Sequence, residues 1–234
     1  MKYIRKSNDR GGANLGWLNS KHSFSFGHYY DPKHMGVSVL RVINDDVVQP
    51  GRGFDTHGHR DMEIISYVID GALEHKDSAG NLYTVPAGEI QRMSAGRGVM
   101  HSEYNASDTN AVNFLQIWIQ PNVFGIEPGY EQKRIEQNGP LTPLVTNNGI
   151  DGSLTMNQDA SIYRLELTTN QGIRLTVSEH NANRIGYLHL VNGTLVANGT
   201  TFTAGDGFMI EAKDVVDIVA SSSIEALWFD LPAI

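Results

Sequence analysis

Two short segments carry side chains that could bind a metal ion together. In G-R-G-F-D-T-H-G-H-R-D-M-E, His57 and His59 stand one residue apart, and in A-G-R-G-V-M-H-S-E-Y, His101 and Glu103 repeat that spacing. Side chains alternate between the two faces of a β-strand, so residues i and i+2 point the same way, about 6.6 Å apart. Each pair could therefore present two ligands on one face of a strand.

Three imidazoles and one carboxylate suit a divalent first-row transition metal. Ca²⁺ and Mg²⁺ prefer oxygen ligands, whereas iron, nickel, manganese, cobalt, copper and zinc accept nitrogen. We take Fe(II) as the first choice among them. Four protein ligands would leave two positions of an octahedron open, which is a feature of reactive rather than structural metals. Either pair alone is a weak signal, but two pairs beside glycines favour one shared site.

Short segments rich in β-branched and aromatic residues must position these side chains. Turn signals such as D-G and N-G separate them, and no long amphipathic helix pattern interrupts them. The pattern predicts an all-β protein. The segments are 37–43, 63–69, 114–119, 173–177, 187–191 and 225–229.

The chain is expected to divide into two β domains, 1–134 and 135–234. The stretch P-N-V-F-G-I-E-P-G-Y (121–130) is rich in Pro and Gly and marks a linker. V-I-D-G-A-L (68–73) also resembles L-V-N-G-T-L (190–195), a weak internal repeat. The two halves therefore look like versions of one barrel.

Composition narrows the class of protein. Of 234 residues, 40% are hydrophobic, enough for a core, and the formal net charge of −8 argues against nucleic acid as a direct ligand. The absence of cysteine removes disulfides, thiolate ligands and cysteine nucleophiles. The sequence has no signal peptide pattern and no apolar run of about 20 residues, so we expect a cytoplasmic protein that does not enter a membrane.

The first histidine segment resembles a known motif. A glycine (Gly51), H-x-H, a glutamate (Glu63) and a later glycine (Gly71) match the first cupin motif. G-N-L-Y-T-V-P-A-G resembles the start of the second cupin motif, but Gln91 stands where that motif places a histidine. In pirins, a branch of the cupins, the remaining ligands come from a later H-x-E pair, and A-G-R-G-V-M-H-S-E-Y resembles that segment.

The resemblance to pirins covers nearly the whole chain, from W-L-N-S-K-H-S-F-S-F-G-H-Y-Y-D-P near the start to L-W-F-D-L-P near the end. It is closest to bacterial pirin-like quercetin 2,3-dioxygenases. It implies a bicupin, with two jelly-roll (double-stranded β-helix) barrels packed together, a metal in the N-terminal domain and a degenerate C-terminal cupin without metal. The ligands that it implies are His57, His59, His101 and Glu103.

Glu63 is the alternative carboxylate. It lies four residues after His59, so by strand parity it could face the same side, and in many other cupins the equivalent glutamate binds metal. We rank it below Glu103, as a group that could orient a ligand. Histidines without a partner at ligand spacing are taken as structural: His28, His34, His75, His180 and His189.

The second half offers an internal control. His57 and His59 lie at fixed offsets before Gly71, and His101 and Glu103 at fixed offsets after Gly88. The same offsets applied to Gly193 and Gly205 lead to other residue types, so we expect no metal in the second half. The residues reached are Glu179, Asn181, Ile218 and Ala220.

The resemblance implies a dioxygenase that opens the central ring of a flavonol such as quercetin and releases carbon monoxide. Its substrates would be the flavonol and dioxygen, with Glu103 as catalytic base as well as ligand. The alternative is a metal- or redox-sensing regulatory protein that acts through a protein partner. A sugar isomerase would share only the barrel, which is a poor basis for a function. We expect a monomer, because two packed barrels need no second copy.

Overall fold

Antiparallel β-strands make up nearly all of the regular structure. The computed structural model describes residues 1–177 and 184–233, and within them the helices are two short 3-10 turns, Ser7–Asp9 and Ile150–Gly152. The all-β prediction is confirmed. None of the helices in these residues is long and apolar enough to cross a membrane.

The N-terminal unit consists of a seven-stranded and a four-stranded sheet. The order of the larger sheet is β12-β9-β6-β11-β4-β3-β2, and that of the smaller is β5-β10-β7-β8. The strands are β2 (Gly11–Asn14), β3 (Leu18–His22), β4 (Leu40–Val48), β5 (Gly53–His59), β6 (Glu63–Asp70), β7 (Ala72–Asp77), β8 (Leu82–Pro86), β9 (Glu89–Ser94), β10 (Val99–Asn105), β11 (Val112–Ile119) and β12 (Gly129–Arg134).

The C-terminal unit has the same composition of sheets. Its seven-stranded sheet has the order β1-β20-β17-β22-β15-β13-β14, and its four-stranded sheet has the order β16-β21-β18-β19. The strands are β1 (Tyr3–Arg5), β13 (Leu141–Thr146), β14 (Leu154–Thr155), β15 (Ser161–Leu167), β16 (Gly172–Thr176), β17 (Arg184–Asn192), β18 (Thr194–Ala197), β19 (Thr200–Thr203), β20 (Gly207–Glu211), β21 (Val215–Ala220) and β22 (Ile224–Pro232).

The two units repeat one topology. Strands β4 to β11 occupy the same places in the first unit as β15 to β22 in the second. Gly71 and Gly193, with φ of 78° and 84°, make the equivalent turns into β7 and β18, where the left-handed conformation favours glycine. The repeat seen in V-I-D-G-A-L and L-V-N-G-T-L is therefore structural, and the fold is the expected two-domain cupin jelly roll.

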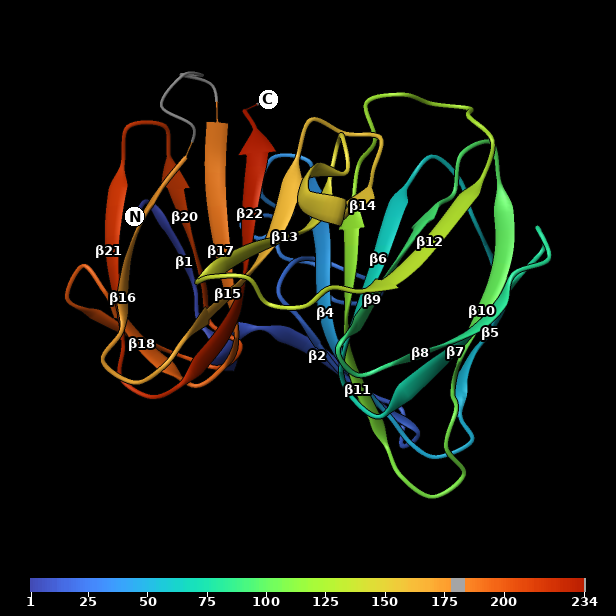
Figure 1. The fold of residues 1–234 in the computed structure, drawn as a ribbon. Helices are drawn as coiled ribbons and strands as arrows, with labels where there is room; N and C mark the ends of the chain where they lie inside the picture. Colours follow the sequence, from blue (N-terminus) through green and yellow to red (C-terminus); the bar gives the residue numbers. More distant parts are fainter. Residues whose placement is uncertain (178–183, 234) are drawn as a thin grey trace.

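The chain crosses between the two units twice. Figure 1 shows the first strand, β1, lying among the strands of the second unit, where it pairs with β20. The chain returns for β2 to β12 and changes sheets again between β12 and β13. The predicted division after residue 134 falls at the end of β12, and the two domains 1–134 and 135–234 remain a prediction.

A shared hydrophobic core joins the larger sheets. Side chains on one face of β6 and β11, such as Ile65 and Ile117, pack in the same cluster as Ile162 and Phe229 of the second unit. Each such side chain, fully buried, contributes about 1.5–3 kcal/mol. The other face of the first unit's large sheet looks into its own barrel. That interior holds buried polar residues, including Ser66, beside two small apolar clusters.

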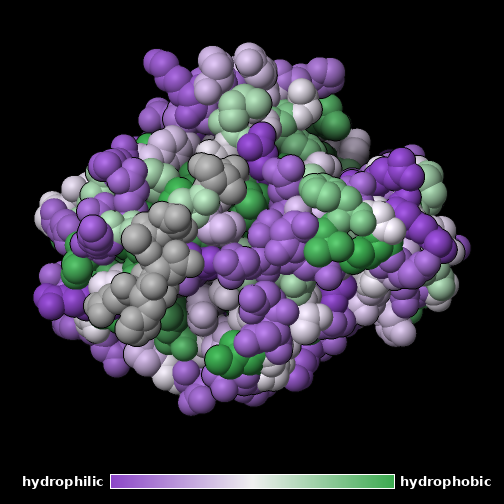
Figure 2. All heavy atoms as spheres, turned by 90° about the horizontal axis from the view of Figure 1, so that it is seen from above, coloured by the Kyte–Doolittle hydropathy of each residue, from purple (hydrophilic) through white to green (hydrophobic). Residues whose placement is uncertain are grey.

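The outer surface is mainly hydrophilic where it can be seen. Figure 2 looks down on the molecule and shows small, separate hydrophobic patches among hydrophilic atoms on the part of this face that carries colour. The N-terminal unit holds many buried polar side chains, and the four predicted ligands come from its strands.

Candidate metal centre

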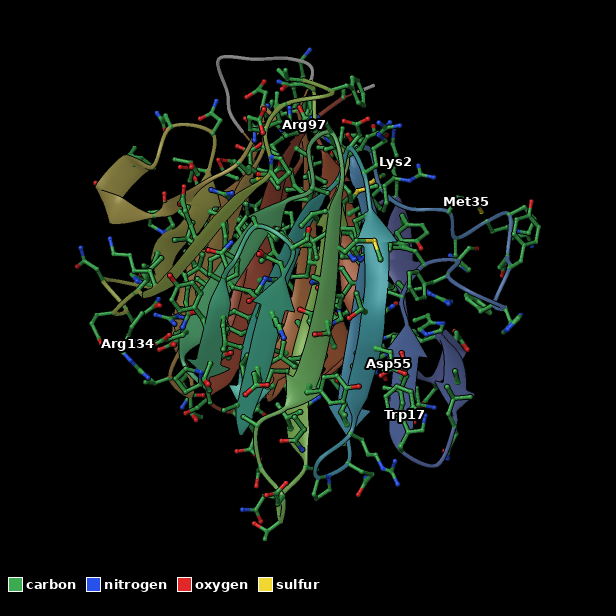
Figure 3. All side chains as sticks on the ribbon, turned by 90° about the vertical axis from the view of Figure 1, so that its right-hand side faces the viewer. Lys2, Trp17, Met35, Asp55, Arg97 and Arg134 are labelled. Carbon is green, nitrogen blue, oxygen red and sulfur yellow. The ribbon has the colours of Figure 1, made fainter. Side chains whose placement is uncertain are left out.

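The predicted histidines come from two neighbouring strands, β5 and β10. These strands pair antiparallel, with His101 opposite His57 and Val99 opposite His59. Figure 3 shows this side of the molecule, with Asp55 of β5 low in the view and Arg97, just before β10, near the top. His57 and His59 follow Asp55 along β5, and His101, on β10, follows Arg97. Strand alternation, as predicted, turns both imidazoles of β5 toward the imidazole of β10.

The three imidazoles form one cluster. Their ring centroids are 4.6 to 4.8 Å apart, and one nitrogen of each lies within 4.8 Å of the others. The Nε2 atoms of His57 and His101 are 3.1 Å apart. The Nδ1–H of His57 donates to the main-chain oxygen of Asp55 at 2.7 Å. This bond fixes the tautomer that leaves the Nε2 lone pair free for a metal.

Burial keeps two of these imidazoles neutral. It lowers the pKa of His101 to about 3 and that of His59 to about 4, and the neighbouring imidazoles, His57 among them, lower both values further. A metal binds the neutral form of histidine, so no proton has to be displaced from these rings near neutral pH. The donor set therefore fits a transition metal.

The carboxylate of Glu103 is fully buried, whereas the side chains of His57 and His59 are partly exposed. It forms a second group with His101 and His75, in which one ligand atom of each lies within 4.8 Å of the others. A register shift between His101 and Glu103, where Phe54 replaces the expected partner on β5, accompanies this placement. His101 is therefore shared by the histidine cluster and the carboxylate group.

Three side chains donate to the Glu103 carboxylate. Gln91 Nε2 and Ser66 Oγ donate to Oε1 at 2.9 and 3.0 Å, and Gln116 Nε2 donates to Oε2 at 2.6 Å. A carboxylate has about four lone-pair positions, so one position remains, on Oε2. Glu103 can use it for a metal or for a proton, one at a time.

Gln91 replaces the histidine of the general cupin motif and has a different task. Its amide nitrogen donates to Ser66 Oγ at 2.9 Å as well as to Glu103, and its amide oxygen accepts from Tyr130 Oη at 2.9 Å. The departure from the motif thus supplies a donor that holds the carboxylate of the later H-x-E pair.

Glu63 faces away from the site, contrary to the expectation from parity. Its carboxylate accepts from Ser94 Oγ at 2.8 Å and from Asn157 Nδ2 of the second unit at 3.0 Å. Ser66, which contacts Glu103, is three residues further along β6 and therefore on the opposite face. Parity fails because β5 ends at His59 and a turn with Asp61 at φ 48° separates it from β6. The role of ligand support proposed for Glu63 is wrong.

His75 and Asp77 lie close to the predicted ligands but were not predicted as site residues. His75 is fully buried on β7 directly opposite Glu103, and its Nε2 lies 3.0 Å from Asp77 Oδ2. The ring of Tyr130 lies against it, with centroids 4.6 Å apart. The H-x-D spacing in A-L-E-H-K-D could have indicated this pair, because it follows the strand rule used for H-x-H and H-x-E.

The second unit has apolar residues at the equivalent positions. Leu195, which follows its turn glycine as Leu73 does, pairs with Ala220, as Leu73 pairs with Asn105. By this register, Val216 and Ile218 of β21 occupy the positions of His101 and Glu103. Leu175 of β16 and Ala197 of β18 occupy the positions of His57 and His75. All four are buried in the apolar core.

This register corrects the simple count by two residues. The count, which ignored gaps, gave Ile218 and Ala220 as the counterparts of His101 and Glu103, whereas pairing gives Val216 and Ile218. Its other results, Glu179 and Asn181, lie outside the described residues, as does His180. The pKa of His189 is lowered to about 4 by burial, consistent with a neutral structural histidine.

The chain matches two protein-family models and is similar to curated bacterial proteins along its length. The Pirin family model matches residues 3–119, and the model described as "Quercetinase C-terminal cupin domain" matches residues 144–231. A protein of Escherichia coli K12 named quercetin 2,3-dioxygenase is 47% identical over all of both chains. A pirin-like protein of Caulobacter vibrioides is 38% identical, covering 97% of this chain and 98% of its own.

A solved structure agrees with the fold. The crystal structure of the bacterial pirin YhhW from Escherichia coli in complex with nickel(II) has a TM-score of 0.94 and 46% identity, covering 99% of each chain. The paired cupin sheets, the interior histidine cluster and the matches along the full chain lead to one conclusion: this chain belongs to the pirin family of the cupin proteins.

Proposed function

We propose that this chain is a metal-dependent dioxygenase that opens the central ring of a flavonol such as quercetin. The observation that carries the proposal is the convergence of three histidines, two of them held neutral by burial, beside a buried carboxylate. Relatives named quercetin 2,3-dioxygenase support the reaction class. The overall change would combine one flavonol and one dioxygen into a phenolic ester and carbon monoxide.

His57, His59 and His101 would hold the metal, with Glu103 as the fourth ligand. We propose Fe(II) as the resident ion, and the relative whose crystal structure is in complex with nickel(II) supports a divalent transition metal. A bound divalent metal would take up the flavonol oxygen and lower its affinity for a proton.

We assign to Glu103 the role of accepting the proton of the flavonol hydroxyl. The free lone pair on Oε2 can accept the proton of the flavonol hydroxyl, while Gln91, Ser66 and Gln116 keep the carboxylate in place. Because only one lone pair remains, accepting the proton requires that Oε2 is not bound to the metal at that moment. Glu103 would therefore alternate between the roles of ligand and base.

Aromatic rings pack beside the histidines and would favour a flat substrate. The ring of Trp118 packs edge-on against His59 at 5.0 Å, and Phe26 packs against Trp118 at 5.4 Å. Planar aromatic ligands favour such surfaces because they bury apolar area and stack. A cytoplasmic location and a monomeric state remain predictions.

The test is carbon monoxide release from quercetin in air by the Fe(II)-loaded protein and by its Ni(II)-loaded form. His57→Ala is expected to abolish release, whereas His28→Ala, a histidine outside the cluster, should leave it unchanged. Metal bound in the expected one-to-one ratio without catalytic release would contradict the enzymatic proposal. A stable complex with a protein partner would then favour the regulatory function.

A further inference from the structure

Behind His101 lies a buried pair, His75 and Asp77, that has no part in the function proposed above. We propose that this pair fixes the orientation and tautomer of His101 through a chain of hydrogen bonds. The chain would run from Asp77 Oδ2 to Nε2–H of His75, and from His75 Nδ1 to Nδ1–H of His101, whose Nε2 serves the metal. The inference rests on the metal site of the proposed function.

The aspartate end of the chain is rigid. Asp77 Oδ1 accepts main-chain hydrogen bonds from Ala79 at 2.9 Å and Asn81 at 3.0 Å, and Oδ2 accepts the side-chain amide of Asn81 at 2.8 Å. The same Oδ2 lies 3.0 Å from His75 Nε2. A carboxylate accepts and does not donate, so the proton of a neutral His75 belongs on Nε2. Its Nδ1 is then a lone pair.

The two histidines leave complementary atoms without partners. His75 Nδ1 and His101 Nδ1 are both buried and have no hydrogen-bond partner within the described part of the chain. If Nε2 of His101 binds metal, the proton of that ring sits on Nδ1 and needs an acceptor. His75 Nδ1 is thus an acceptor without a donor, and the neighbouring His101 Nδ1–H is a donor without an acceptor. Leaving both unpaired in the interior costs free energy, which a hydrogen bond between them would avoid.

The spacing of the rings fits this bond. The ring centroids of His75 and His101 are 5.4 Å apart, with a 52° angle between planes. Two imidazoles joined by one N–H···N bond have centroids about 5 Å apart, because the nitrogens are separated by about 3 Å. A small rotation of His101 on binding metal would complete the chain.

The competing use of the same atoms is a second metal position between His75, His101 and Glu103. The contacts favour the hydrogen-bond chain. His75 already uses Nε2 for Asp77, and the one free lone pair of Glu103 is taken by the metal of the proposed function. The experiment below separates the two, since one predicts a single ion and the other predicts two.

The first measurement is long-range ¹H–¹⁵N NMR of the histidine rings in protein loaded with diamagnetic Zn(II). The expected result is one zinc per chain, His75 protonated on Nε2, and a slowly exchanging Nδ1 proton on His101. A proton on His75 Nδ1, or coordination of that atom by a second zinc, would overturn the proposal.

Variants give an independent readout in metal affinity, measured by chelator competition. His75→Leu removes the acceptor and should weaken Zn(II) binding by about tenfold or more, the usual effect of losing a partner of a metal-bound histidine. His75→Asn places an amide oxygen near the position of Nδ1 and should recover part of the affinity. His189→Leu, at another buried histidine with an unpartnered Nδ1, is the control for lost stability alone.

Equal affinities in His75→Leu, His75→Asn and wild type would overturn the inference and leave the proposed function intact. An equal loss in His75→Leu and His189→Leu would also overturn it, because the effect would then follow stability. Failure of the wild-type protein to bind any divalent metal would overturn both proposals.

Discussion

The Nε2 atoms of His57 and His101 lie 3.1 Å apart, although the residues are 44 positions apart in the chain. Two nitrogens at right angles around one ion, each about 2.1 Å from it, are separated by about 3.0 Å. Two lone pairs at this distance repel unless a proton or a cation lies between them. The fold therefore brings the two imidazoles to the separation that a shared metal requires.

Replacing one of these nitrogens should abolish metal binding, whereas replacing Glu63 should not. His101→Ala removes the imidazole that both ligand groups share, so the affinity for Ni(II) should fall at least a hundredfold. Glu63→Gln alters a contact with Asn157 of the second unit and should leave the affinity within about threefold of wild type. Calorimetric titration of both variants decides the matter. Strong binding by His101→Ala would refute the assigned ligand set.

The metal-free protein should lose stability in acid. The pKa values of His59 and His101, about 4 and about 3, are lowered by burial from the ordinary 6.5. Below pH 6.5 these two histidines are protonated in the unfolded chain but remain neutral in the folded chain. The free energy of unfolding therefore falls as the pH drops toward 4. Urea unfolding in the presence of a chelator, at pH 7.5, 6 and 5, measures this slope.

The matched variant for that experiment is His59→Gln. It removes one of the depressed groups, so its stability should decline less steeply than that of wild type over the same pH range. Identical slopes would mean that these histidines accept protons in the folded state and are not held neutral.

The sequence was sufficient to predict the fold class and the convergence of His57, His59 and His101, because both depend on short-range patterns. H-x-H and H-x-E each lie within one strand, where alternation is a reliable guide to direction. The same rule failed for Glu63 because it was applied across a turn, where the chain passes from one sheet to the other. A pattern rule therefore holds only as far as its element extends.

Other features depend on contacts between distant segments, which no local pattern encodes. The pairing of β1 with β20 joins residues some 200 positions apart. His75 looked isolated because its neighbours, His101 and Glu103, reach it only through the pairing of β7 with β10. The donors to Glu103 likewise come from three strands of the opposite sheet.

The buried carboxyl of Asp46 is expected to destabilise the folded state at high pH. Burial raises its pKa to about 7, an effect that a hydrogen bond from Ser20 only partly offsets. The folded state favours the protonated form, so its contribution is present below pH 4 and is lost as the pH rises through 7. The loss is on the order of a few kcal/mol.

Asp46→Asn should remove this dependence. Relative to wild type, the variant should gain stability between pH 5 and pH 8, as measured by urea unfolding at both values. Asp45→Asn leaves Asp46 in place and removes only the neighbouring charge that adds to the raised pKa, so a smaller gain is expected there. If Asp46→Asn shows the same difference from wild type at both pH values, Asp46 does not titrate in this range.

The last prediction concerns the support of Glu103. Gln116→Leu removes the shortest donor to its carboxylate, at 2.6 Å, and leaves Oε2 without a protein partner. An unsatisfied buried group costs about 1–3 kcal/mol, so the free energy of unfolding should fall by that amount. The three histidines are untouched, and metal binding should persist. Turnover of quercetin should fall more than tenfold, because the proton acceptor is no longer held in place.

Gln158→Leu separates the two effects of that change. Gln158 is a buried glutamine of the second unit whose amide donates to the main-chain oxygen of Gln120 at 2.7 Å. Its loss should cost similar stability and leave turnover unchanged. Parallel urea unfolding and carbon monoxide assays on both variants would show whether position or stability matters. Full turnover by Gln116→Leu would exclude Glu103 as a base that depends on its donors.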